Sequence, residues 1–177
     1  IEAQAQLIRQ KLDEAGGKPV RVLFSAHGVP ESVISRRGDP YQAQVEMTAR
    51  ALVAELGLAD WQVCYQSRVG PMKWLGPSTP EALEQAASDG VGVVVAPIAF
   101  VSEHIETLFE LDIEYAHLAQ TLGIKPYLRS PAVSVTPVFI HTLADAVRAA
   151  GPKTAPFGPG CPADFAACPC RAGTLAA

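Results

Sequence analysis

Residues 78–101 read STPEALEQAASDGVGVVVAPIAFV, and this stretch decides the fold because it joins a helix to a strongly apolar strand. Ser78 and Glu81 have the spacing of a capping box, and Pro80 stands in the first turn, so a helix is predicted to begin there. The apolar run Val91–Ala96 is typical of a buried strand. A helix followed at once by such a strand is the repeating unit of a parallel sheet.

The same alternation continues on both sides of this stretch, so an α/β fold with a parallel, helix-covered sheet is predicted. A loop rich in Gly, Pro and Ser is expected over residues 25–40. In such folds ligands gather at the carboxyl ends of the strands, which points to the loops after residues 24, 66 and 96. Strands are predicted over Val20–Phe24, Trp61–Gln66 and Pro126–Arg129, and helices over residues 1–16, 41–56, 102–122 and 136–149.

Composition excludes several classes of protein. The chain has 177 residues, of which 49% are hydrophobic and 18% charged, and this excludes disordered and collagen-like chains. The net charge of −4 differs from the basic footprint of a nucleic-acid-binding protein. The longest apolar stretch, Val91–Val101, is too short to cross a bilayer. Four cysteines are too few for a disulfide scaffold, so a cytoplasmic location is expected.

His27 follows the first predicted strand directly, in the sequence Ser25-Ala26-His27-Gly28. Histidine is the side chain whose charge changes nearest neutral pH, so this is a suitable place for a reactive group. The alternative interpretation is a histidine that is satisfied by a neighbouring backbone group.

A row of acids marks the predicted helix over residues 102–122. Glu106, Glu110 and Glu114 are spaced four apart and therefore share one helical face, which Glu103 and His117 extend. A solvated face is the plain alternative. Apolar residues wrap most of the rest of this helix, which predicts that it is largely buried. Carboxylates on a buried helix would line a polar channel or hold cations.

The loop over residues 68–77 carries Met72 and Trp74 on a frame stiffened by Gly and Pro. Such a surface suits a flat apolar ligand, although a Trp that plugs into the core is the alternative. An imidazole with carboxylates suits a divalent first-row metal such as ferrous iron. Inserting that cation into a porphyrin releases two pyrrole protons, so the chemistry needs a base beside the ring.

Three cysteines lie close together near the end of the chain, at Cys161, Cys168 and Cys170. Three thiolates in so short a run suggest a soft metal or an iron–sulfur cluster. Three free thiols in a loose tail are the alternative. Cys64 lies in the middle of a predicted strand and is expected to be a small core residue.

Four long stretches together resemble the ferrochelatase family, and the resemblance runs almost unbroken from about Pro19 to Arg171. The stretches are LFSAHGVPESV (23–33), GDPY (38–41), QSRVGPMKWLGPST (66–79) and PIAFVSEHIETLFELDIEY (97–115). The resemblance implies a lyase of haem biosynthesis that inserts ferrous iron into protoporphyrin IX to give protohaem. It also implies a chelatase-like fold of two Rossmann-like, three-layer halves with the porphyrin cleft between them.

The resemblance assigns roles residue by residue. His27 matches the active-site histidine, which acts either as the base for the pyrrole protons or as a metal ligand. Glu106 matches the carboxylate that faces this histidine across the porphyrin. Residues implied to contact the metal are His27, Glu106, His104, Glu110 and Glu114, and Ser25, Met72 and Trp74 are expected to contact the porphyrin.

Family chains are about twice as long, and everything here matches their C-terminal half. Residues 1–150 are therefore expected to form the C-terminal chelatase-like domain, and residues 151–177 a cysteine-containing tail. The N-terminal half of the same enzyme is the expected partner, and no nucleic acid is. The three tail cysteines match three of the four ligands of a [2Fe–2S] cluster, and the fourth normally comes from the other half.

Two rival interpretations stay open at this point. One is a cobalt or nickel chelatase that acts on another tetrapyrrole, and coproporphyrin in place of protoporphyrin is a variant of the same idea. The other is a non-catalytic module that binds haem or an iron–sulfur cluster. Peripheral membrane contact and the oligomeric state are also open.

Overall fold

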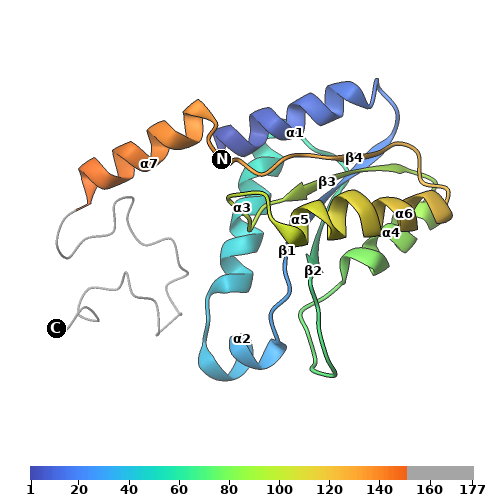
Figure 1. Cartoon of the computed structure of the whole chain (residues 1–177), viewed down its shortest axis with the longest axis horizontal. Helices are drawn as coiled ribbons and strands as arrows, with labels where there is room; N and C mark the ends of the chain where they lie inside the picture. Colours follow the sequence, from blue (N-terminus) through green and yellow to red (C-terminus); the bar gives the residue numbers. More distant parts are fainter. Residues whose placement is uncertain (151–177) are drawn as a thin grey trace.

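The sheet has four strands, which are all parallel, as the alternation predicts, and the structure gives their order as β2-β1-β3-β4 (Figure 1). The computed structural model describes residues 1–150. The strands are β1 (Val20–His27), β2 (Trp61–Gln66), β3 (Gly92–Pro97) and β4 (Tyr127–Arg129). Because all four run the same way, their carboxyl ends meet at one edge, where the three candidate loops begin.

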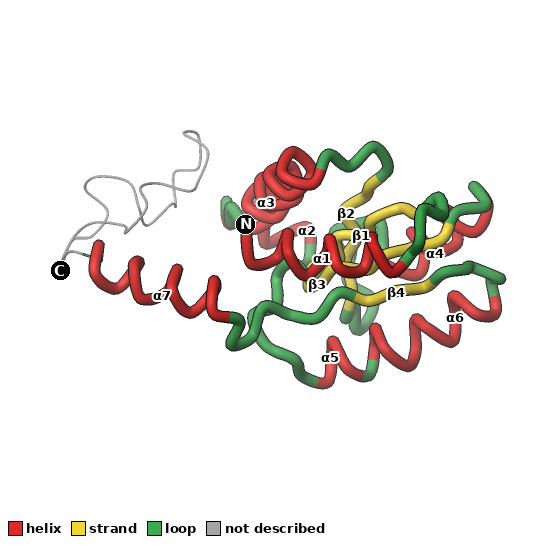
Figure 2. Tube along the Cα trace, turned by 90° about the horizontal axis from the view of Figure 1, so that it is seen from above, coloured by secondary structure: helices red, strands yellow, loops and turns green. Residues whose placement is uncertain are grey.

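Helices cover both faces of the sheet and make three layers (Figure 2). On one face, Ile8 and Leu52 from two helices pack against Phe24. On the other face, Leu83 and Leu111 pack against Leu23. The helices are α1 (Glu2–Glu14), α2 (Glu31–Arg37), α3 (Tyr41–Leu56), α4 (Thr79–Ser88), α5 (Ile105–Leu108), α6 (Tyr115–Thr121) and α7 (Pro137–Ala149), with a π-helical segment, η1 (Glu110–Glu114), between α5 and α6.

Several sequence predictions are confirmed. The strand over residues 61–66 and the helix over residues 41–56 have the predicted bounds. The Ser78 side chain accepts a hydrogen bond from Glu81 N, and the Glu81 carboxylate accepts one from Ser78 N, so the capping box is present. Cys64 is buried in the core, as expected for its place in a strand.

Strand β1 is longer than predicted, and a helix follows it inside the predicted loop. Residues 25–27 pair with Cys64, Tyr65 and Gln66 of β2, so that His27 is the last residue of the strand. The short helix α2 lies within residues 25–40, where only a loop is expected from the Gly and Pro content. Pairing with a neighbouring strand is a tertiary contact, which a local pattern cannot reveal.

The helix predicted over residues 102–122 differs from expectation in two ways. It begins only at Ile105, and η1 interrupts its α-helical hydrogen bonding. It is also not largely buried, because only one face, which includes Thr107 and Leu111, packs on the sheet. The prediction of burial is wrong for this chain: Ile105 is 74% exposed, and Phe109 and Ile113 are more than half exposed.

Helix α7 projects from the body of the domain near the N-terminus, and none of its residues is buried (Figures 1 and 2). No helix among residues 1–150 is both long and apolar enough to cross a membrane. The predictions for Cys161, Cys168 and Cys170, and for a separate tail, fall outside the described residues.

Candidate active site

His27 is held at the end of β1 by its own main chain and by α3. The Tyr41 hydroxyl donates a hydrogen bond of 2.9 Å to the His27 carbonyl oxygen. The ring atom Nδ1 lies 2.7 Å from the Gly28 carbonyl oxygen. Because a carbonyl oxygen only accepts, Nδ1 must carry the hydrogen, and in the neutral ring Nε2 then presents a lone pair.

The lone pair of His27 faces Glu106. Nε2 lies 3.4 Å from Glu106 Oε1, and the two side chains remain 41% and 32% exposed. A neutral imidazole and an ionised carboxylate are both acceptors at this gap, so the pair is satisfied by a proton or a cation between them. The two residues on which the sequence analysis placed the chemistry are therefore brought together.

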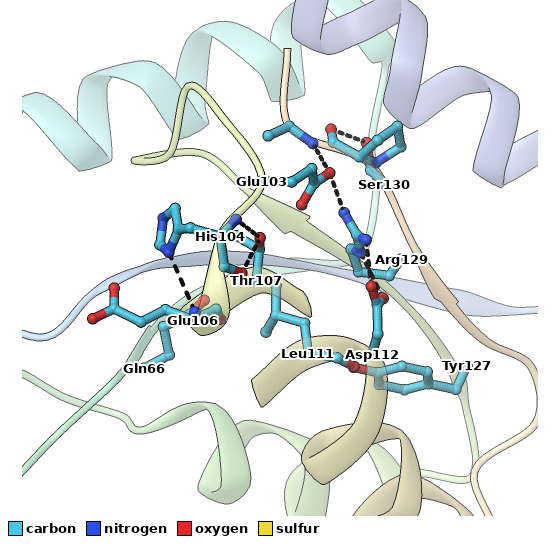
Figure 3. A network of polar contacts seen from close by, with 12 residues as sticks. Gln66, Glu103, His104, Glu106, Thr107, Leu111, Asp112, Tyr127, Arg129 and Ser130 are labelled. Atoms are coloured by element: carbon cyan, nitrogen blue, oxygen red, sulfur yellow. Dashed lines mark hydrogen bonds and ion pairs between the residues drawn. The ribbon is translucent and has the colours of Figure 1, made fainter. Parts of the chain in front are cut away.

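Glu106 stands in the first turn of α5, which His104 caps. His104 Nδ1 accepts a hydrogen bond of 3.2 Å from Glu106 N, and Thr107 Oγ1 accepts one of 2.9 Å from His104 N (Figure 3). The His104 ring also lies against Phe100, with ring centroids 5.0 Å apart. Nδ1 of His104 is thus used as a helix cap, and a role toward metal would fall to its other ring nitrogen.

Gln66, at the end of β2, links the core to the acidic segment. Its Nε2 donates to the Glu106 carbonyl oxygen at 2.5 Å and to Glu110 Oε2 at 3.2 Å. Its Oε1 accepts a hydrogen bond of 2.7 Å from Ser25, which also lies 3.1 Å from Thr79 Oγ1. Ser25 is fully buried in this chain, where its hydroxyl helps to fix the Gln66 side chain, and its expected contact with a porphyrin stays a prediction.

Glu110 is fixed by donors from two directions. Ser67 N and Ser67 Oγ donate to Glu110 Oε2 at 3.0 and 2.9 Å. The Tyr115 hydroxyl lies 3.5 Å from the same oxygen, and burial raises the pKa of Tyr115, so this hydroxyl stays a donor. Ser67 has a φ of 59°, which is uncommon for a residue with a side chain and is stabilised here by its two bonds to one carboxylate.

Glu103, Glu114 and His117, the outer residues of the predicted acidic stripe, do not join Glu106 and Glu110 in one cluster. Glu114 is exposed, and so is His117. Glu103 does not extend the stripe, because its carboxylate turns toward β4 and bonds to Arg129 and to Ala132 N. The π-helical segment changes the rotation between successive residues, so the spacing of a regular α-helix does not apply there.

Met72 and Trp74 lie on a loop that pairs with the chain after His27. Leu75 N donates to the Val29 carbonyl oxygen at 3.0 Å, and Glu31 N donates to the Lys73 carbonyl oxygen at 2.9 Å. Met72 is exposed and Trp74 is half-buried, with its indole nitrogen lacking a partner among the described residues. The loop therefore presents apolar side chains beside the His27 end of the sheet.

The backbone at Gly28 is packed too closely for a residue with a side chain. A Cβ at this position would lie 2.8 Å from the Gln66 carbonyl oxygen and 2.9 Å from Arg68 Cγ. We expect Gly28→Ala to lower the free energy of unfolding by about 1–3 kcal/mol, because a rigid backbone oxygen must move. Chemical denaturation measures this. Gly76→Ala is the matched control, since a Cβ there meets nothing within 4 Å, and an equal loss in both variants would contradict the prediction.

Sequence reasoning missed Gln66, Ser67 and Tyr41. For Gln66 and Ser67, the only indication in the sequence is their position at the end of a predicted strand, where ligands gather in this class of fold. Among residues 1–150 no group of three or more His, Cys, Asp or Glu side chains is arranged to hold a metal ion. Burial raises the pKa of Cys64 to about 11, so its thiol stays protonated and inert in the core.

Comparison with known proteins agrees with these observations. A family profile described as ferrochelatase matches residues 1–150. The chain is 52% identical over 183 aligned positions to a ferrochelatase of Caulobacter vibrioides, covering 99% of this chain and 52% of that protein. It is 53% identical over 181 positions to one of Phenylobacterium zucineum, with the same two coverages. A ferrochelatase of Synechococcus elongatus is 49% identical over 151 positions, covering 84% of this chain and 39% of that protein.

The matched length and the identities lead to one conclusion. The chain spans about half the length of the Caulobacter and Phenylobacterium relatives. Identity near one half over nearly the whole chain, together with a profile match over all the described residues, is far above what a shared fold alone requires. The chain therefore belongs to the ferrochelatase family.

Proposed function

We propose that this chain supplies the catalytic face of an enzyme that inserts ferrous iron into protoporphyrin IX. The observation that carries the proposal is the pairing of His27 Nε2 with the Glu106 carboxylate, 3.4 Å apart at the ligand-gathering edge of the sheet. The relatives that share this sequence bear the name ferrochelatase. Since the chain covers about half of their length, the activity is proposed for the complete protein.

The reaction exchanges two pyrrole protons for one dication. His27 Nε2 has the lone pair to take a proton as it leaves the ring, while Nδ1 stays bound to the Gly28 carbonyl oxygen. Glu106 stabilises the imidazolium that forms and offers a second acceptor. The same two atoms can instead ligate the incoming iron, and either role uses the geometry described above.

Ferrous iron is proposed to reach this pair along the acids. Glu114 is exposed and can meet an ion in solvent, while Glu110 lies between it and Glu106 in the chain. The half-buried Glu110 is already bound by Ser67, so it would guide the ion by its charge more than by ligation. The second ring nitrogen of His104 would add a donor beside Glu106.

The porphyrin is proposed to lie against Met72 and Trp74, and the other half of the enzyme to close the cleft. Exposed apolar side chains in residues 105–113, among them Ile105, Phe109 and Ile113, favour such a covering partner, because exposed apolar surface is common at interaction sites. An apolar platform favours protoporphyrin over coproporphyrin, whose extra carboxylates call for cationic partners.

The tail and the cellular setting complete the proposal. We propose residues 1–150 as the chelatase-like domain and residues 151–177 as a tail whose Cys161, Cys168 and Cys170 can supply three thiolates to a [2Fe–2S] cluster. Cys64 is buried with its thiol beside Thr79, so it does not fit as the fourth ligand. Sparse cysteines support a cytoplasmic location.

A chimera tests the function directly. In it, this chain replaces the matching half of the Caulobacter vibrioides ferrochelatase, a substitution that 52% identity allows. We expect the purified chimera to insert ferrous iron or zinc into protoporphyrin IX, which is followed by the loss of free-porphyrin fluorescence. The unaltered Caulobacter protein is the control for the assay.

Two outcomes would contradict this proposal. A folded chimera that binds protoporphyrin and leaves it metal-free would favour the non-catalytic binding module. Faster insertion of cobalt into a more acidic tetrapyrrole than of iron into protoporphyrin would favour the cobalt or nickel chelatase.

A further inference from the structure

Arg129 is a largely buried cation on the edge strand β4, and it makes three short contacts with two acids. Its Nε and Nη2 donate to the two carboxylate oxygens of Asp112, at 2.7 and 2.5 Å. Its Nη1 donates to Glu103 Oε1 at 2.6 Å. The Arg129 side chain is only 13% exposed, and its bond to the partly buried Glu103 is shielded from solvent more than an ordinary surface ion pair, whereas Asp112 lies at the surface.

The two acids stand on either side of the segment that carries the proposed chemistry. Glu103 precedes α5 and Asp112 lies within η1, while Glu106 and Glu110 lie between them in the sequence. Figure 3 shows the Arg129 side chain between Glu103 and Asp112. A single planar guanidinium thus joins both ends of this segment to the sheet. Lysine has a single ammonium group and no such fork, so it cannot reproduce the arrangement.

Neighbouring contacts tie the same segment to the same strand. The Tyr127 hydroxyl donates a hydrogen bond of 2.6 Å to the Leu111 carbonyl oxygen. Burial, reinforced by the Asp112 charge, raises the pKa of Tyr127, so the hydroxyl remains a donor. Glu103 Oε1 also accepts a bond of 2.8 Å from Ala132 N in the loop after β4.

The segment needs such ties because it has little stability of its own. Helix α5 has only four residues, and short helices are marginal without tertiary contacts. Its outward side chains, such as Ile105 and Leu108, are exposed and add little packing among residues 1–150. Gln66 holds the segment from β2, which leaves β4 to hold its other side.

The surroundings of Glu103 agree with this arrangement. Its carboxylate is partly buried, and Oε1 accepts hydrogen bonds from both Ala132 N and Arg129. Its second oxygen is buried without a partner among the described residues. Removing the guanidinium would therefore leave a partly buried carboxylate uncompensated, which strongly disfavours the present geometry.

We propose that Arg129 is a positioning residue that clamps the Glu103–Asp112 segment to β4 and so sets the place of Glu106 opposite His27. This inference rests on the proposed function, because it explains how the proposed catalytic carboxylate is held. Arg129 itself contacts neither His27 nor Glu106 in the described contacts, so it acts through the backbone of the segment.

The chain contains a matched control in Arg21. This arginine is also on a strand, is 15% exposed, and joins two acids, Asp60 at 2.6 Å and Asp89 at 2.9 Å. It stands near the start of β1, at the opposite end of the strand from His27. Arg21→Gln therefore removes a comparable ion-pair bridge without touching the proposed site.

The experiment compares Arg129→Gln, Arg129→Lys and Arg21→Gln in the chimera. We expect Arg129→Gln to lower kcat for metal insertion by about 10- to 100-fold, since displacements near 1 Å have effects of this size. The KM for porphyrin should change little, because Met72 and Trp74 are untouched. Arg129→Lys should recover only part of kcat, and Arg21→Gln should keep the parental value.

Amide hydrogen exchange on the 177-residue chain gives a readout that is independent of activity. Exchange should accelerate in residues 103–112 of Arg129→Gln and stay parental there in Arg21→Gln. Equal kcat in the Arg129→Gln and Arg21→Gln chimeras, or no local acceleration of exchange, would overturn the clamp. An inactive parent chimera would instead contradict the proposed function, and hydrogen exchange would still decide whether Arg129 holds the segment.

Discussion

Replacing His27 with alanine should lower kcat for metal insertion by about 100- to 10,000-fold, the range that a positioned acid–base group contributes. The variant loses the Nε2 lone pair that faces Glu106, and with it both the acceptor for a pyrrole proton and a nitrogen ligand for iron. Porphyrin affinity should change much less, because the apolar side chains of the loop over residues 68–77 remain. Fluorescence of protoporphyrin in the chimera, with zinc or anaerobic ferrous iron, measures both quantities.

His141→Ala is the matched control for this prediction. His141 is exposed on α7, away from the end of β1, so its removal should leave kcat unchanged. A His27→Ala chimera that inserts metal at the rate of the His141→Ala chimera would exclude His27 from the chemistry.

The second large effect is expected for Glu106→Gln, which should lower kcat by about 100-fold or more. The substitution keeps the size of the side chain and removes its charge, so the imidazolium of His27 loses its stabilising partner. The fold should survive, because α5 holds this residue through its backbone: Glu106 N donates to His104, and its carbonyl oxygen accepts from Gln66. Thermal unfolding at the parental temperature would show that the loss is chemical.

Two further variants sharpen that result. Glu106→Asp retains a carboxylate one methylene shorter, so it should keep more activity than Glu106→Gln. Glu84→Gln removes an equal charge from the exposed face of another helix, α4, and should behave as the parent. If Glu106→Gln and Glu84→Gln have the same kcat, the carboxylate has no part in the reaction.

Local sequence patterns predict the fold where local chemistry decides it. The capping box at Ser78 and Glu81, the apolar strands and the periodic helix of residues 41–56 each depend on neighbours in the chain. The alternation of these elements then predicts which ends of the strands meet, and so it places His27 near the acidic segment.

Features that depend on distant contacts were not predictable in this way. Ser25 is buried because β1 continues as long as β2 pairs with it, and Ile105 is exposed because no residue in the described range 1–150 covers it. The ion pairs from Arg129 to Glu103 and Asp112 join residues that no helical or strand periodicity relates, so the sequence pattern does not predict them. The start of α5 depends on an imidazole cap, whereas the usual caps are Ser, Thr, Asp and Asn.

The short distance between the acceptor atoms of His27 and Glu106 limits what can occupy the gap between them. Two electron-rich atoms 3.4 Å apart repel an anion and leave room for a single small, electron-poor guest. Under the proposed function, a proton that leaves the porphyrin and a dication that enters it would compete for this one site. They would then have to occupy it in turn, each leaving before the next arrives.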